Sequence, residues 1–144
     1  MTGASVVIAG AGIVGASIAY HLAARGCRDV LLLERADSPA SGSTGRSAGG
    51  VRHQFGSAVN VQLSLYSIAR LQAFSEEIGG HASLRQVGYL FLHTDPATWA
   101  HYQEQAQLQR SLGVPVELLG ADEALRLVPG ARVDDVLGAS FCPW

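Results

Sequence analysis

The chain has 144 residues, with 12 acidic and 10 basic side chains and a formal net charge of −2, so its length allows about one domain. It contains no basic run, which disfavours nucleic acid and a charged membrane surface as partners, because both need clustered positive charge. Charged residues make up 15% and apolar residues 48%, so the sequence has more apolar surface than its length easily buries.

The first 34 residues have the pattern of a β-α-β unit. Residues 5–9 form an apolar, β-branched run that is typical of a strand buried in a parallel sheet. Apolar positions then recur at helical spacing from Ile13 to Arg25, and Gly26 stands where a helix-ending glycine is expected. Residues 30–33 predict a second buried strand, with a right-handed crossover between the two strands.

A polar, glycine-rich loop is expected from Arg35 to about Gly56, and it is too long to be a plain connector. Ser57 is expected to cap one long helix that ends at Gly79 and Gly80. The pattern then changes to shorter elements, without a second glycine-rich turn. We expect strands over residues 87–93, 116–119 and 136–141, a helix between Asp95 and Gly113, and a helix over residues 122–128.

Residues 10–15 read Gly-Ala-Gly-Ile-Val-Gly, between the first predicted strand and its helix. Gly10 permits the tight turn, Gly12 lets the backbone approach a pyrophosphate, and Gly15 lets the helix pack closely on the strand. The helix N-terminus adds unpaired N–H groups and a positive dipole. Glu34 can accept hydrogen bonds from ribose hydroxyls, and its charge would repel a 2′-phosphate. The pattern predicts a dinucleotide site that disfavours NADP and leaves NAD and FAD open.

The dipeptide Glu34-Arg35, followed by Ser-Thr-Gly-Arg-Ser-Ala-Gly-Gly over residues 43–50, resembles the D-amino-acid oxidase superfamily of FAD-dependent oxidoreductases. The nearest branch is that of the sarcosine oxidase beta subunit and dimethylglycine dehydrogenase, to which residues 51–55, 86–90 and 136–141 are similar as well. The resemblance implies an α/β fold with a Rossmann-like FAD-binding β-α-β unit of the GR2 flavoprotein type, then the start of an α+β substrate domain. We therefore predict an FAD-binding domain over residues 1–80, the beginning of a substrate domain over residues 81–144, and a chain that is a fragment of a larger fold.

The resemblance also implies which residues hold FAD. The main chain of the glycine turn would hold the pyrophosphate, and Glu34 and Arg35 would lie at the adenosine half. Hydroxyl and guanidinium groups of the following loop suit phosphate oxygens, and its small residues let the chain pass a flat ring; a polar loop without a ligand is the alternative. The predicted cofactor-binding residues are Gly10, Ala11, Gly12, Ile13, Val14, Gly15, Glu34, Arg35, Ser43, Thr44, Arg46, Ser47, Ala48 and Gly49.

Arg52 and His53 follow this loop, in a neighbourhood that in relatives approaches the substrate side of the flavin. An arginine there could clamp a substrate carboxylate, and a histidine could handle a proton or orient an amine. We name both as candidate catalytic residues; binding of phosphate or of a nearby acid is the alternative for Arg52. The other histidines lack metal-ligand spacing, so no metal is expected.

The resulting hypothesis is the N-terminal part of an enzyme that oxidises the C–N bond of a secondary or tertiary amino acid, such as sarcosine or dimethylglycine, by hydride transfer to flavin. Oxygen or an electron-transfer partner would reoxidise the flavin. The chain could be one subunit of a hetero-oligomer. Three alternatives remain: oxidation of a 2-hydroxy acid or glycerol phosphate, an NAD-dependent dehydrogenase, and a non-catalytic nucleotide-binding module. With two predicted parallel strands and no second glycine-bearing segment, the 144 residues alone are expected not to turn over amines.

Two further features concern the cellular location. Cys27 and Cys142 lie far apart and form no Cys-x-x-Cys spacing, which favours a reducing compartment and hence the cytoplasm. The apolar stretch over residues 4–24 has no basic segment before it and is interrupted by glycines. We therefore expect neither a targeting peptide nor a membrane span there.

Overall fold

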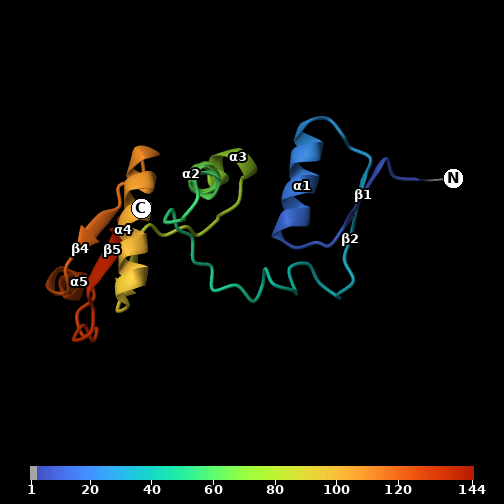
Figure 1. Cartoon of the computed structure of the whole chain (residues 1–144). Coiled ribbons are helices and arrows are strands. Elements are labelled where there is room, and N and C mark those ends of the chain that lie inside the picture. Colours follow the sequence, from blue (N-terminus) through green and yellow to red (C-terminus); the bar gives the residue numbers. More distant parts are fainter. Residues whose placement is uncertain (1–2) are drawn as a thin grey trace. The chain divides into compact units, whose positions relative to one another are not determined.

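The computed structural model describes residues 3–144, and its chain forms two compact units that divide after Gly50 (Figure 1). We call residues 3–50 the N-terminal unit and residues 51–144 the C-terminal unit. The boundary predicted near residue 80 separates an FAD-binding domain from a substrate domain, whereas the division after Gly50 separates compact units. The functional boundary stays a prediction. Within the described residues, no helix has both the length and the apolar character that a membrane crossing requires.

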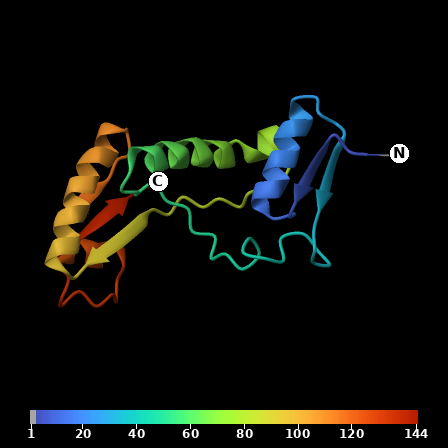
Figure 2. The ribbon, with the colours of Figure 1, turned by 45° about the vertical axis from the view of Figure 1, so that its right-hand side comes forward.

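The N-terminal unit is the predicted β-α-β unit. It comprises β1 (Val6–Ala9), α1 (Ile13–Ala24) and β2 (Val30–Leu33), and β1 and β2 pair in parallel along their whole length. Helix α1 lies against both strands (Figures 1 and 2). Gly26 follows the helix with φ of +89°, a conformation that glycine adopts without strain. The prediction for this region is confirmed nearly residue for residue.

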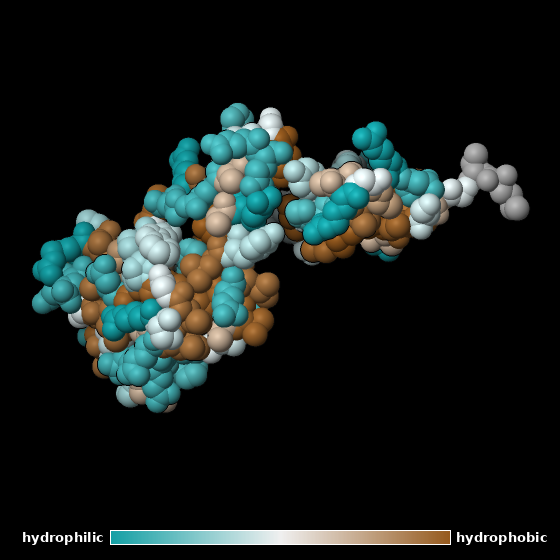
Figure 3. Space-filling view, turned by 90° about the horizontal axis from the view of Figure 1, so that it is seen from above, coloured by the Kyte–Doolittle hydropathy of each residue, from teal (hydrophilic) through white to brown (hydrophobic). Residues whose placement is uncertain are grey.

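The N-terminal unit buries little of its apolar surface. Ile8 and Ala11 are its buried apolar side chains among the described residues. Val14 on α1 is 69% exposed and Leu33 on β2 is 49% exposed, and apolar residues reach the surface of both units (Figure 3). A parallel sheet normally has both faces covered by helices, so this unit offers apolar faces that need further cover.

The C-terminal unit is an antiparallel sheet with helices. Its elements are α2 (Ala58–Gln72), α3 (Phe74–Ile78), β3 (Tyr89–His93), α4 (Pro96–Ser111), β4 (Glu117–Leu119), α5 (Ala121–Leu127) and β5 (Gly138–Cys142). The strands run in the order β3-β5-β4, with β5 antiparallel to both neighbours. Helix α4 contacts all three strands, as Figure 2 shows for β3 and β5.

One hydrophobic core holds the C-terminal unit together. It joins helices α2 and α4, the residues before β4, and β5 through Val61, Ala106, Val114, Val116 and Cys142. Each of these side chains is at most 2% exposed. Complete burial of a valine contributes on the order of 1.5–3 kcal/mol, so the buried valines of this cluster stabilise the C-terminal unit.

Three expectations about element boundaries are wrong. The strand expected from Val87 begins at Tyr89, after Gly88 with φ of +84°. The single helix predicted after Ser57 is two helices, because Ala73 has ψ of 1° and separates α2 from α3. Apolar residues keep their helical spacing across this one-residue break, so periodicity did not reveal it. The last strand begins at Gly138 instead of Val136, since the Val136 N–H donates to the Val133 carbonyl in a turn.

Candidate functional site

The glycine turn between β1 and α1 has the backbone geometry that its sequence predicts. Gly10 has φ of +103°, and its N–H donates to the Leu33 carbonyl at 2.7 Å. A Cβ on Gly15 would collide with the Gly10 carbonyl oxygen and come within 3.4 Å of Ile8. Gly15 is therefore required for the close approach of α1 to the turn.

The N-terminus of α1 presents donors without an intrahelical partner. Gly12 is the N-cap residue and supplies no side-chain cap, and the first helical bond runs from the Ala16 N–H to the Gly12 carbonyl at 3.0 Å. The Ile13 N–H instead donates to the Thr44 hydroxyl at 3.1 Å. A Cβ on Gly12 would lie 3.0 Å from that hydroxyl. The helix terminus thus combines open donors, a positive dipole and one hydroxyl, which is what an anionic phosphate group needs.

Glu34, directly after β2, is tied to the same turn. Its Oε2 accepts from the Ala11 N–H at 2.8 Å, and its Oε1 accepts from the Ala36 N–H at 3.0 Å. These backbone donors, Ala36 first and then Ala11, lower the pKa of the carboxyl, so Glu34 is ionised at neutral pH. An ionised carboxylate has about four acceptor positions, so two remain for hydroxyl donors such as those of a ribose.

The predicted cofactor loop is held to the glycine turn by main-chain contacts. The Ala40 N–H donates to the Ala11 carbonyl at 3.1 Å, and the Gly45 N–H donates to the Ala40 carbonyl at 2.8 Å. A Cβ on Gly45 would collide with the Ala40 carbonyl oxygen. The segment is therefore an ordered loop that returns toward the helix N-terminus through Thr44.

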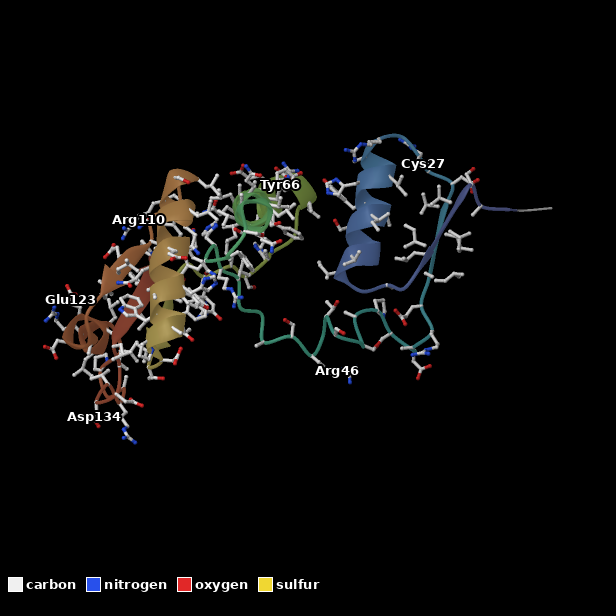
Figure 4. The ribbon with its side chains drawn as sticks, viewed as in Figure 1. Cys27, Arg46, Tyr66, Arg110, Glu123 and Asp134 are labelled. Atoms are coloured by element: carbon white, nitrogen blue, oxygen red, sulfur yellow. The ribbon has the colours of Figure 1, made fainter. Side chains whose placement is uncertain are left out.

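The remaining loop residues are exposed. The Arg46 Nε donates to the Gly42 carbonyl at 3.3 Å, and Figure 4 shows the Arg46 side chain pointing away from the ribbon. The Ser47 hydroxyl accepts from the Gly49 N–H at 3.1 Å. The exposed side chains among the predicted cofactor-binding residues are those of Ile13, Val14, Glu34, Arg35, Ser43, Arg46, Ser47 and Ala48, and Gly49 is exposed as well. Their contacts with a cofactor remain predictions.

Arg52 lies in the C-terminal unit on a set of three rings that we call the aromatic platform, made of Phe55, Tyr89 and Phe91. Its guanidinium carbon is 4.9 Å from the Phe55 ring centre, 5.3 Å from that of Phe91 and 5.9 Å from that of Tyr89. The Arg52 Nε is buried and has no hydrogen-bond partner. Within residues 3–144, no carboxylate forms an ion pair with Arg52. A positive group in this state is prepared for an anion.

His53 is placed differently from Arg52. It is 2% exposed, its Nδ1 lies 3.4 Å from the Ser64 hydroxyl of α2, and its ring meets the Trp144 ring edge-on. Burial lowers its pKa, which favours the neutral imidazole. These contacts describe a side chain packed within the C-terminal unit, and a proton-handling role for His53 remains a prediction.

The sequence did not single out the platform or the residues beside it. Phe91 and Ser140 are paired across β3 and β5, so their side chains share one face of the sheet. Arg52 meets Phe91 on that face, and Gln54 donates from Nε2 to the Ser140 hydroxyl at 3.2 Å. The residues come from segments far apart in the sequence, so local patterns gave no signal for their meeting.

The sequence matches the family described as FAD dependent oxidoreductase (DAO) over residues 5–144. The chain therefore belongs to this family, whose cofactor is FAD. The glycine turn, the open helix N-terminus and the ionised Glu34 fit the pyrophosphate and ribose of that cofactor. The resemblance found in the sequence is confirmed, and so is the choice of FAD over NAD.

Individual relatives cover nearly the whole chain. FAD-dependent oxidoreductase domain-containing protein 1 of Xenopus laevis is 34% identical over 96% of this chain, which spans 30% of that protein. Mitochondrial sarcosine dehydrogenase of Homo sapiens is 32% identical over 97% of this chain, which spans 15% of that protein. Among solved structures, L-proline dehydrogenase from P. horikoshii superposes with a TM-score of 0.87 at 36% identity, covering 98% of this chain and 37% of that one. The chain thus spans less than two-fifths of each relative.

Proposed function

We propose that this protein oxidises the C–N bond of a secondary or tertiary amino acid of the sarcosine or dimethylglycine type, with FAD as the hydride acceptor. The bond broken is the C–H bond next to nitrogen, and its electron pair leaves with the hydrogen as hydride. The resulting imine is hydrolysed by water to an amine and a carbonyl compound. Similarity to sarcosine dehydrogenase and to L-proline dehydrogenase supports an amino-acid substrate with a secondary amine.

The observation that carries the proposal is the state of Arg52. Its guanidinium rests on the aromatic platform with a buried, unpartnered Nε and without a carboxylate partner in the described chain. A guanidinium binds a carboxylate through two parallel hydrogen bonds. An amino-acid carboxylate would supply the missing acceptors and the missing negative charge. In this proposal Arg52 binds and orients the substrate.

The N-terminal unit supplies the other half of the proposal. Open N–H groups at α1, the Thr44 hydroxyl and the Glu34 carboxylate would hold the phosphates and the adenosine ribose. The protein then contributes binding and orientation, while the flavin supplies the redox chemistry. Oxygen or an electron-transfer partner remains the proposed final acceptor, and a partner subunit and a cytoplasmic location remain proposals as well.

The test uses the protein expressed from its complete reading frame. The purified protein is expected to show flavin absorbance, and anaerobic addition of sarcosine or dimethylglycine should bleach it. Lactate and glycerol 3-phosphate serve as the C–O substrates of the rival reaction. Bleaching by those two compounds, with none by the amino acids, would replace the proposed reaction by the rival one.

The 144-residue chain provides a second comparison. We propose that it does not oxidise amines by itself, because its N-terminal unit has two strands and exposed apolar faces. The same anaerobic assay with added FAD measures this directly. Reduction of the flavin by sarcosine in the presence of the 144 residues would contradict that statement.

A further inference from the structure

We propose that Gln54 and Ser140 form a positioning pair that fixes the Arg52 guanidinium over the aromatic platform. The inference rests on the proposed function for its catalytic meaning, because it concerns the residue that would bind the substrate carboxylate. Its structural basis lies wholly within the C-terminal unit.

The first step is the register between the segment of residues 52–55 and the sheet. This segment has no regular secondary structure, so no strand ladder holds it against β3 and β5. Instead the Gln54 Nε2 donates to the Ser140 hydroxyl at 3.2 Å, and both residues are at most 4% exposed. A buried hydrogen bond is costly to break because either partner would be left unsatisfied. The bond therefore fixes where residue 54 meets the sheet.

The second step continues the hydrogen bonding into β3. The Ser140 hydroxyl lies 3.2 Å from the His93 Nε2, so one serine oxygen joins Gln54 to a second buried side chain. Ser140 can accept from Gln54 and donate to a neutral His93 at the same time. His93 contacts the rings of Trp99 and Tyr102 from α4. The hydroxyl is thus held in place by rigid neighbours on two strands and a helix.

The third step connects this anchor to Arg52. Ser140 and Phe91 are directly paired on β5 and β3, so the anchor of Gln54 and the ring under Arg52 are neighbours on one sheet face. Farther along the segment, the Gln109 Nε2 of α4 donates to the Phe55 carbonyl at 2.9 Å. Among residues 3–144, the Arg52 guanidinium contacts three rings and its Nε has no hydrogen-bond partner, and such ring contacts are weak in direction. Its placement therefore depends on the neighbouring residues 54 and 55.

The first experiment measures placement without any enzymatic activity. In NMR spectra of the 144-residue chain, ring currents should shift the Nε–H resonance of Arg52 away from the position of exposed arginines. The resonance is assigned as the one that disappears in the variant Arg52→Lys. Gln54→Ala and Ser140→Ala are expected to move this resonance to the position of exposed arginines. Ile68→Ala is the matched control and should leave it unchanged, because Ile68 is as buried as Gln54 and lies outside the core cluster against which Phe55 packs. An unchanged resonance in Gln54→Ala, or an equal change in Ile68→Ala, would overturn the proposal.

The second experiment measures the consequence in the holoenzyme from the complete reading frame. Gln54→Ala should raise the KM for sarcosine about tenfold, within the range that coupled neighbours show, while the KM for the carboxylate-free dimethylamine stays the same. In an Arg52→Ala background, Gln54→Ala should add nothing further to the sarcosine KM. Additive effects in the two backgrounds would overturn the proposal. A holoenzyme that no amino acid reduces would refute the proposed function, and the resonance of Arg52 would still decide the positioning.

Discussion

The N-terminal and C-terminal units are built in opposite ways. In the N-terminal unit, Ile8 and Ala11 are the buried apolar side chains among the described residues. Backbone groups of the glycine turn join this turn to Leu33, Glu34, Ala40 and Thr44. The C-terminal unit has a core of five fully buried side chains and a three-stranded sheet. Backbone geometry at the glycine turn determines the structure of the first unit, whereas side-chain burial in the core determines that of the second. Substitutions should therefore act through different physical causes in the two units.

The largest effect is expected from Gly15→Val. The new side chain would collide with the Gly10 carbonyl oxygen. Moving either the turn or the helix to relieve this collision would disrupt the packing of α1 against the turn. We expect a loss of about 3 kcal/mol or more in the stability of the N-terminal unit, and a flavin content near zero in the protein from the complete reading frame. Gly42→Val, where a Cβ meets nothing within 4 Å, is the matched control. Normal flavin binding by Gly15→Val would contradict the account of the turn.

In the C-terminal unit, Val61→Ala should have the next largest effect. Val61 is 0% exposed in the core, whereas Val59 on the same helix is 64% exposed. Removing the buried methyl groups should cost about 2 kcal/mol through lost transfer energy and a cavity, while Val59→Ala should change stability by less than about 0.5 kcal/mol. Urea unfolding followed by the tryptophans of the C-terminal unit measures both. Equal effects at the two positions would mean that helix α2 does not pack as described.

The two units should also differ in their response to acid. Burial lowers the pKa of His53 and of His93 below the ordinary 6.5, so below that pH the unfolded chain takes up protons first and the C-terminal unit loses stability. In the N-terminal unit, Glu34 has a pKa lowered from 4.5 by hydrogen bonds, so its contribution is lost only as the pH falls from 4.5. Amide hydrogen exchange between pH 7.5 and pH 4 measures the stability of each unit separately and therefore distinguishes the two pH dependences. A C-terminal unit of constant stability between pH 7 and pH 5 would contradict the burial of these histidines.

A smaller effect is expected at the start of α4. The Asp95 Oδ2 accepts from the Thr98 N–H at 2.7 Å and from the Thr98 hydroxyl at 2.8 Å. Asp95→Ala should destabilise the C-terminal unit by about 1 kcal/mol, and Asp95→Asn by less, because asparagine also caps helices well. Thermal unfolding of the three proteins measures the order. Equal midpoints for Asp95→Ala and the parent would show that the cap contributes nothing.

The sequence predicted the elements of the N-terminal unit well because each signal is local. The strand, the glycine turn, the helix and Gly26 follow one another within 26 residues, and each part constrains its neighbour. The contacts of Glu34 with the turn also follow from a β-α-β unit, since parallel strands end at the same edge. Local patterns also predicted the cap at Ser57 and the start of a helix at Asp95, which the structure confirms.

The sequence could not predict what surrounds Arg52. The aromatic platform requires β3 and β5 to pair in one register, with Tyr89 opposite Cys142 and Phe91 opposite Ser140. A shift of one residue would place the rings on the other face, and nothing in either strand alone fixes that choice. The break at Ala73 was hidden for a related reason, because apolar spacing stays the same on both sides of it. Long-range pairing, rather than composition, decides this part of the site.

The most direct test of the central claim compares sarcosine with dimethylamine, which lacks the carboxylate, as anaerobic reductants of the holoprotein from the complete reading frame. If Arg52 recognises an amino-acid carboxylate, sarcosine bleaches the flavin at concentrations at least about tenfold lower than dimethylamine, as the loss of one charged hydrogen-bonding group implies. Bleaching by both compounds at the same concentration, or by neither, would contradict the claim.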